Sequence, residues 1–201
     1  MRLLLIRHGE TALNAARILQ PADTPLSARG MAQAAALGRR LVAEPITAVW
    51  SSDLPRAWQT AEAVAAGRPI TAEPLLQERH FGAWRGRPYD SLGVDPLSLV
   101  DAPPGGEALA AFDARIDRAF DQALSAAAQL RGALVLVTHG LVIHRLLARR
   151  IARPAGTTLP TRISNTSLTV VEGEPPLAVR IDCTAHLGDG AADDPLALSG
   201  A

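Results

Sequence analysis

The stretch RLLLIRHGETALN, residues 2–14, decides how the rest of the chain is interpreted. It begins with a continuous apolar run, which is typical of a central strand that a parallel sheet buries on both faces. Arg7 and His8 follow this run directly, so a guanidinium and an imidazole stand at the end of a strand that should be buried. The stretch ALVLVTHG, residues 133–140, repeats the pattern with His139. Two such strand ends indicate a functional site.

Strand-like and helix-like segments alternate along the chain. Continuous or β-branched apolar segments predict strands at residues 2–6, 46–52, 133–138, 167–172 and 177–184. Helical spacing of apolar residues predicts helices at residues 27–42, 54–66, 107–130 and 141–151. Ser27 is a plausible N-cap for the first of these helices. This alternation predicts an α/β domain with a mostly parallel sheet.

Length and composition restrict the architecture and the partners. The 201 residues suit one domain, which we expect at residues 1–187, followed by a flexible C-terminal tail at 188–201. Twenty basic residues, all of them arginine, balance twenty acidic residues. This neutral charge gives no reason to expect a nucleic acid or a membrane surface as partner. Lysine-based catalysis is excluded because the chain has no lysine.

Cysteine content and hydropathy suggest the compartment. Cys183 is the only cysteine, so no disulfide can form within the chain, which suits a reducing environment. No stretch approaches the roughly 18 apolar residues of a membrane span. We therefore expect a cytoplasmic protein.

Several polar residues follow apolar segments, and open α/β sheets bind ligands beyond the carboxyl ends of their strands. The residues of interest are Arg7, His8, Thr11, Asn14, Arg56, Glu78 and His139. Taken together they offer two imidazoles, two guanidiniums and a carboxylate. Phosphoryl transfer needs this set: a nucleophile, fixed cations for the non-bridging oxygens, and an acid for the leaving oxygen.

Seven segments, in order, resemble those of the histidine phosphatase superfamily, which includes phosphoglycerate mutases and phosphatases. They are LIRHGETALN, DTPLSARG, SSDLPRAWQTAE, LLQERHFGAWRG, PPGGEALAAF, VLVTHGLVIHRLLA and DCTAHL. The resemblance implies a three-layer sandwich, with helices on both faces of a mostly parallel central sheet. It also implies a phosphoryl-transfer enzyme that needs no cofactor and no metal ion.

The resemblance assigns roles to individual residues. His8 would accept the phosphoryl group as a phosphohistidine, while Glu78 would protonate the leaving oxygen and then activate water. Arg7, Arg56 and His139 would hold the non-bridging oxygens. Further expected substrate contacts are Asn14, Thr11, Gln20, Arg79 and Gly140.

The acceptor of the phosphoryl group separates two activities within the family. The segment ERHFG resembles ERHYG of the mutases, which keeps an isomerase as an alternative. Mutases usually carry Thr-Gly at Leu19-Gln20, Tyr at Phe81 and Lys at Tyr89, however, and these differences favour a phosphomonoester hydrolase. The substrate is then a small phosphate ester whose identity stays open, and the protein is expected to be a monomer or a homodimer.

Three further points stay open. His8, His139 and Glu78 could instead form a two-His, one-carboxylate metal site. The chain could also be a non-catalytic sensor of a phosphorylated ligand. Finally, Glu107 offers a second carboxylate near Glu78, next to Ala108 where many relatives have Ser.

Overall fold

The computed structural model describes residues 1–188 and contains one mixed sheet between helices. The predicted tail, residues 188–201, lies almost wholly outside the described residues. The strands are β1 (Arg2–Arg7), β2 (Ile46–Ser51), β3 (Ile70–Ala72), β4 (Ala133–Thr138), β5 (Leu168–Glu172) and β6 (Leu177–Cys183), in the order β3-β2-β4-β1-β5-β6. The longer helices are α2 (Ala28–Arg40), α3 (Pro55–Ala65), α4 (Leu109–Ala128) and α5 (Gly140–Arg149).

Four neighbouring strands run parallel. β4 lies between β1 and β2, and β3 extends the sheet beyond β2. On the other side, β5 pairs antiparallel with β1, and β6 pairs antiparallel with β5. The expectation of a mostly parallel sheet is confirmed. Because β1, β2 and β4 are parallel neighbours, their carboxyl ends meet at one edge of the sheet.

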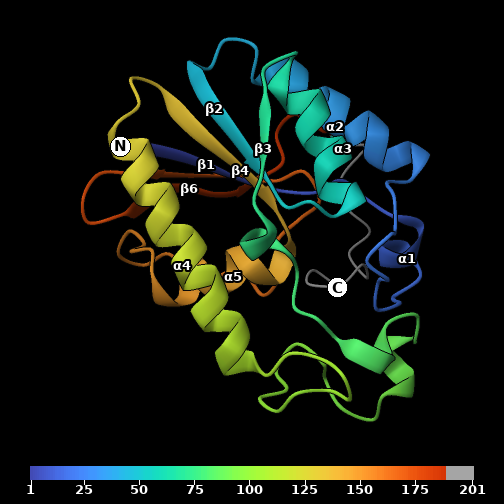
Figure 1. Ribbon diagram of the computed structural model, residues 1–201. Helices are drawn as coiled ribbons and strands as arrows, with labels where there is room; N and C mark the ends of the chain where they lie inside the picture. The colour runs from blue at the N-terminus through green and yellow to red at the C-terminus, as the bar shows by residue number, and fades with distance from the viewer. Residues whose placement is uncertain (189–201) are drawn as a thin grey trace.

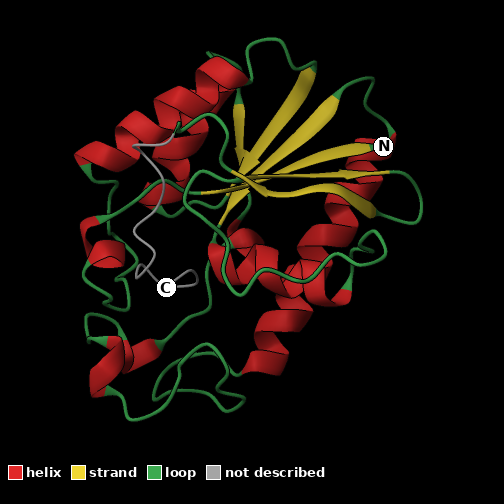
Figure 2. Ribbon diagram, turned by 180° about the vertical axis from the view of Figure 1, so that it is seen from behind, coloured by secondary structure: helices red, strands yellow, loops and turns green. Residues whose placement is uncertain are grey.

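Alternate side chains of β1 enter two separate cores. Leu3 and Leu5 pack with residues of α4 and α5, whereas Leu4 and Ile6 pack with residues of α2 and α3. Figure 1 and Figure 2 show the two pairs of helices on opposite sides of the sheet. The three-layer architecture implied by the family resemblance is therefore confirmed. The apolar run at residues 3–6 is fully buried because both faces of β1 are covered.

Helix ends and the shortest elements differ from the sequence predictions. Ser27 caps α2, since its hydroxyl accepts a hydrogen bond from the Gly30 amide at 3.0 Å. The other predicted helices begin or end one or two residues away from their predicted limits. The sequence patterns missed β3, α1 (Ala12–Ala15) and the 3-10 helices η1 (Pro74–Leu76), η2 (Gly82–Trp84) and η3 (Tyr89–Ser91). Elements of three or four residues are too short to display a hydrophobic period.

Two glycines bring the start of α2 against the loop that follows β1. A Cβ at Gly9 would lie 2.6 Å from the carbonyl oxygen of Gly30, and a Cβ at Gly30 would lie 2.0 Å from that of Glu10. Only glycine permits backbones to approach so closely. The Gly that follows His8 is thus required by packing, and it fixes the loop next to the imidazole.

The long connection between β3 and α4 covers the carboxyl edge of the sheet. It projects beyond the sheet in Figure 1, in green to yellow-green, and contains η2 and η3. Arg79 anchors it, because the guanidinium donates to the carbonyls of Leu99, Asp101 and Glu107 at 2.6, 2.9 and 2.9 Å. The connection is therefore tied to the segment that carries Glu78.

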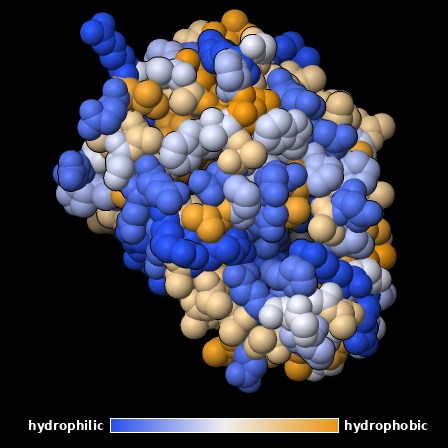
Figure 3. Space-filling view, in the orientation of Figure 1, coloured by the Kyte–Doolittle hydropathy of each residue, from blue (hydrophilic) through white to orange (hydrophobic). Residues whose placement is uncertain are grey.

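The face of the molecule that carries α4 is largely polar. On the face that carries α4, hydrophilic residues dominate and apolar residues form separate patches (Figure 3). Among residues 1–188, none of the helices has the length and apolar character needed to cross a lipid bilayer.

Candidate active site

The carboxyl ends of the parallel strands bring the expected site residues together. Arg7 ends β1 and pairs in register with Thr138, the last residue of β4, so His8 and His139 follow adjacent strands. Their rings lie edge to face with centroids 5.2 Å apart. Both imidazoles are buried. The two His-Gly stretches therefore form one site, as the sequence pattern predicts.

The hydrogen bond to the His8 ring leaves its other nitrogen available. Nδ1 of His8 lies 2.7 Å from the carbonyl oxygen of Gly9, which can only accept a hydrogen bond. Nδ1 therefore carries the proton, and Nε2 of the neutral ring keeps its lone pair. Burial lowers the pKa of His8 well below the ordinary imidazole value, and the charges of Arg56 and Arg7 lower it further. His8 is thus held in the nucleophilic form at neutral pH.

The backbone of His8 is fixed by the loop that precedes β5. Its carbonyl oxygen accepts hydrogen bonds from Nδ2 of Asn165 at 2.9 Å and from the Thr166 amide at 3.3 Å. Thr166 adopts a φ of 52°, which is rare for a β-branched residue. Such strained backbone is tolerated where surrounding contacts enforce it. Neither residue was expected from the sequence, because their contact with His8 depends on the β1–β5 pairing.

His139 is oriented by Ser52, a residue that follows β2. The Ser52 hydroxyl contacts Nε2 of His139 at 2.9 Å and accepts from the Leu54 amide at 3.3 Å. Burial lowers the pKa of His139 well below its ordinary value, and the charges of Arg56 and Arg7 lower it further. Nδ1 of His139 has no hydrogen-bond partner among residues 1–188. The ring thus presents one unsatisfied nitrogen within the buried centre.

Arg7 and Arg56 supply the two fixed cations. Nη1 of Arg7 donates to the Ile163 carbonyl at 2.5 Å, while Nη1 of Arg56 donates to the Pro21 carbonyl at 3.3 Å. Burial lowers the pKa of Arg56 to about 10, so it stays charged at neutral pH. Its Nε has no hydrogen-bond partner among the described residues. The charges of both arginines act on His8, Glu78 and His139 alike, which places these groups in one cluster.

Glu78 belongs to the connection between β3 and α4, and its carboxylate lies against the first turn of α5. Its carboxylate accepts hydrogen bonds from the Arg79 amide at 2.9 Å and from the Leu141 amide at 3.2 Å. Burial raises the pKa of Glu78 to about 7, although these two bonds and the charges of Arg56 and Arg7 lower it. A carboxyl group with this pKa exchanges its proton near neutral pH, as a general acid and base must.

Glu107 and Arg115 hold the segment that carries Glu78. The guanidinium of Arg115, on α4, donates to both carboxylate oxygens of Glu107 at 2.9 Å. It also donates to the carbonyls of Leu75 and Gln77 at 2.7 and 2.9 Å. The carboxylate of Glu107 is therefore held in an ion pair, an arrangement that suits a positioning role.

Thr11, Asn14 and Gln20 form a buried group beside the cluster. The Thr11 hydroxyl donates to Oε1 of Gln20 at 2.8 Å and accepts from the Asn14 amide at 3.0 Å. All three side chains are buried. Gly140 is the first residue of α5, directly after His139. Whether these residues contact a substrate stays a prediction.

Arg79 differs from the expectation of a substrate contact. Its Nε and both Nη atoms donate to backbone carbonyls of the connection described above. Its geometry thus gives Arg79 an anchoring role, because a guanidinium used in this way has little capacity left for a ligand.

The metal-site alternative requires three converging ligands. No group of three His, Cys, Asp or Glu side chains suited to a metal occurs within residues 1–188.

Comparisons with known proteins agree with this geometry. The family model of the histidine phosphatase superfamily, branch 1, matches residues 3–178. A Yersinia pestis protein named "Probable phosphoglycerate mutase GpmB" is 33% identical over 184 residues, covering 86% of this chain and 85% of the relative.

Solved structures of phosphatases are also similar. A candidate α-ribazole-5'-P phosphatase from Escherichia coli K-12 has a TM-score of 0.78 and 31% identity, over 92% of this chain and 97% of that one. A mycobacterial glucosyl-3-phosphoglycerate phosphatase with inorganic phosphate has a TM-score of 0.75 and 25% identity, over 93% and 99% of the two chains. With the matched fold and the paired His-Gly strand ends, these findings show that the chain belongs to the histidine phosphatase superfamily, branch 1.

Proposed function

We propose that the protein is a phosphomonoester hydrolase that acts through a phosphohistidine on His8 and needs no metal ion. The observation that carries the proposal is the 2.7 Å contact between Nδ1 of His8 and the Gly9 carbonyl. It leaves Nε2 as a neutral nucleophile in a centre that also holds two guanidiniums. The substrate is a small phosphate ester, and the proposed compartment is the cytoplasm.

In the first step, Nε2 of His8 attacks phosphorus and the bond to the leaving oxygen breaks. Protonated Glu78 gives its proton to that oxygen, so the alcohol departs uncharged. The non-bridging oxygens would be held by Arg7, Arg56 and His139. Nε of Arg56 and Nδ1 of His139, which have no hydrogen-bond partner among residues 1–188, suit an anion. Guanidiniums in this arrangement supply the charge neutralisation that other phosphoryl-transfer enzymes obtain from Mg²⁺.

In the second step, the Glu78 carboxylate takes a proton from water, which attacks the phosphorus of the phosphohistidine. The P–N bond breaks, inorganic phosphate leaves and neutral His8 is restored. A pKa of about 7 suits both roles of Glu78, because the group must lose and regain one proton in each cycle.

Rapid quenching of the enzyme during turnover of ³²P-labelled substrate tests the intermediate. We expect a phosphoryl adduct that is labile in acid and stable in base, mapped to His8, and we expect His8→Ala to abolish both adduct and turnover of p-nitrophenyl phosphate. Full activity of His8→Ala, or an adduct on another residue, would remove the mechanism.

A mutase is the second candidate because of the ERHFG segment and the phosphoglycerate mutase name of the Yersinia pestis relative. Incubation with 3-phosphoglycerate separates the two activities. Formation of 2-phosphoglycerate faster than release of phosphate would favour the mutase. Binding of phosphate esters without either reaction would favour the sensor.

A further inference from the structure

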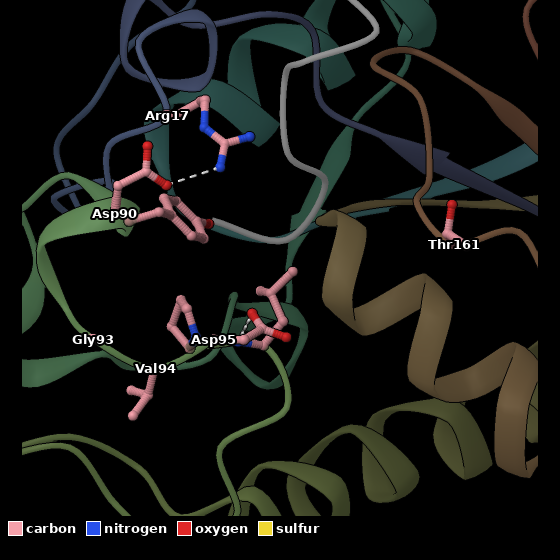
Figure 4. Close-up of a pocket in the computed structure, with 9 residues that line it drawn as sticks. Arg17, Asp90, Gly93, Val94, Asp95 and Thr161 are labelled. Carbon is pink, nitrogen blue, oxygen red and sulfur yellow. Dashed lines mark hydrogen bonds and ion pairs between the residues drawn. The ribbon is translucent and has the colours of Figure 1, made fainter.

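A cavity of about 580 Å³ lies beneath the connection between β3 and α4. Figure 4 shows the ion pair of Arg17 and Asp90 at one end of it, Val94 and Asp95 along one wall, and Thr161 across from them. The Tyr89 amide donates to the Arg17 carbonyl at 3.0 Å, which fixes one wall to the other. The cavity is thus built from three separate segments of the chain.

Shared lining residues connect this cavity with a second one next to α5. A second cavity of about 320 Å³ shares Asp95, Leu97 and Thr161 with the first and is also lined by Leu141. The Leu141 amide binds Oε2 of Glu78 at 3.2 Å. The two cavities together, which we name the double cavity, therefore lie one residue away from the carboxyl group that would protonate the leaving oxygen, whereas Glu78 itself lines a separate cavity of about 420 Å³ with His80 and Glu107.

Tyr89 offers a buried hydroxyl to the double cavity. The residue lines the first cavity and is 5% exposed, and its hydroxyl has no hydrogen-bond partner among residues 1–188. Burial raises the pKa of Tyr89, and the charge of Glu78 raises it further, so the phenol stays neutral. A buried hydroxyl without a partner is costly unless a ligand satisfies it.

The charged side chains of the double cavity are unsuited to a carboxylate ligand. Both arginines that line it are paired with acids, Arg17 with Asp90 at 3.1 Å and Arg145 with Asp113 at 2.5 Å. Asp95 adds a carboxylate, whose Oδ1 accepts a hydrogen bond from the Leu97 amide at 3.0 Å. His144 is the remaining titratable side chain, and burial followed by the charges of Arg145 and Arg153 lowers its pKa. It is therefore neutral at pH 7.

We propose that the double cavity receives the alcohol part of the substrate and selects an uncharged group bearing hydroxyls, such as a sugar or a polyol, over a carboxylate-bearing group. Hydroxyls of the ligand would pair with the Tyr89 hydroxyl, with Thr161 and with Asp95. A carboxylate would meet Asp95 without an unpaired cation to balance it. This inference rests on the proposed function, since it assumes that the phosphoryl group lies at His8.

Two phosphate esters of nearly equal size test the selection. sn-Glycerol 3-phosphate and 3-phosphoglycerate differ in one position, where the first has a CH₂OH group and the second has a carboxylate. Release of phosphate at pH 7 should give a kcat/KM at least about tenfold higher for the glycerol ester, equal to about 1.4 kcal/mol. An equal or reversed preference would overturn the inference.

Variants locate the source of the preference. Tyr89→Phe should lower kcat/KM for sn-glycerol 3-phosphate about three- to tenfold relative to p-nitrophenyl phosphate, whose leaving group has no further hydroxyl. Asp95→Asn should narrow the discrimination against 3-phosphoglycerate. Asp121→Asn removes the same charge from the exposed face of α4 and is the matched control, with the preference unchanged. Equal effects of the two Asp variants would contradict a role for the double cavity.

Failure of this inference is distinguishable from failure of the proposed function. Turnover of p-nitrophenyl phosphate with an adduct on His8, but without the preference for the glycerol ester, would overturn the selection alone. Absence of turnover and of the adduct would overturn the proposed function.

Discussion

The Ser52 hydroxyl lies 2.9 Å from Nε2 of His139, although the two residues are 87 positions apart in the chain. Because this hydroxyl already accepts the Leu54 amide, its own proton is free to be donated to Nε2. With Ser52 as the donor, the proton of the neutral His139 ring resides on Nδ1, which can donate to a phosphoryl oxygen. We therefore expect Ser52 to favour the Nδ1-protonated tautomer.

Ser52→Ala should lower kcat/KM for p-nitrophenyl phosphate about tenfold, since the lost hydrogen bond contributes on the order of 1 kcal/mol. The ¹⁵N chemical shifts of His139 should change from one tautomer to a mixture. Ser52→Thr keeps the hydroxyl and should restore both readouts in part. A single Nδ1-protonated tautomer with unchanged kinetics in Ser52→Ala would contradict the role.

The pH dependence of turnover should reflect two groups with opposite shifts. Glu78, with a pKa of about 7, must be protonated to assist an alkyl leaving group, so kcat/KM for alkyl phosphates should fall as pH rises above about 7. His8 should stay neutral well into the acid range because its pKa is lowered. Profiles for p-nitrophenyl phosphate should fall less steeply at high pH, since nitrophenolate leaves without a proton. Parallel profiles for the two substrates would exclude Glu78 as the acid.

Glu78→Gln should show how much the buried carboxyl group destabilises the folded state at neutral pH. The folded-state pKa of Glu78, about 7, is above its ordinary value of 4.5, so the folded state binds more protons between these pH values. Wild-type stability from this group therefore decreases as pH rises from about 4.5 to 7. The free energy of unfolding of the variant, measured in urea relative to that of the wild type, should therefore increase by roughly 3 kcal/mol between pH 4.5 and pH 8. A stability difference that is independent of pH would refute the shift.

Arg115→Lys should loosen the segment that positions Glu78, although Arg115 itself lies on α4. One ammonium cannot replace the bonds that the guanidinium makes to Glu107 and to the carbonyls of Leu75 and Gln77. We expect about 2–4 kcal/mol lower stability. The rate on alkyl phosphates should fall at least tenfold more than that on p-nitrophenyl phosphate, roughly 1.4 kcal/mol of barrier. Arg118→Lys, at an exposed position of the same helix, is the control and should leave both quantities unchanged.

Gly30→Ala should lower both stability and turnover. Replacing a helical Gly by Ala usually stabilises by about 1 kcal/mol, but here the Cβ would lie 2.0 Å from the Glu10 carbonyl oxygen. The loop after His8 must then move. Gly38→Ala meets the Ala63 carbonyl at 2.4 Å, on the α2–α3 contact, and should destabilise without changing kcat of the folded protein. Equal kcat in the two variants would show that the Gly9–Gly30 contact does not position His8.

The parts of the site that belong to strand ends were predictable from the sequence. Arg7, His8 and His139 follow continuous apolar runs, and parallel strands bring such ends together. Glu78 was singled out because it follows an apolar segment, but its role as acid was implied by the family resemblance, since the short β3 strand and η1 that lead to it have no periodic pattern.

Contacts between distant segments were not predictable from residue patterns. The role of Ser52 depends on the β2–β4 pairing, and that of Arg115 depends on how α4 crosses η1. Arg79 shows the converse. It was expected to contact the substrate, whereas its guanidinium binds carbonyls at residues 99, 101 and 107. Sequence spacing reveals neighbours along the chain, but not which backbone groups a long side chain reaches.

Arg79 ties the connection between β3 and α4 to the segment that carries Glu78 through backbone contacts. The Arg79 guanidinium donates hydrogen bonds to backbone oxygens at residues 99, 101 and 107. These bonds therefore do not depend on which side chains the connection between them carries. We therefore expect the exposed residues of 90–98 to tolerate replacement while the acid and the nucleophile keep their places, whereas Tyr89 packs in the core. One scaffold can diverge to new phosphate esters by exchanging this short segment, and directed evolution of the protein should begin there.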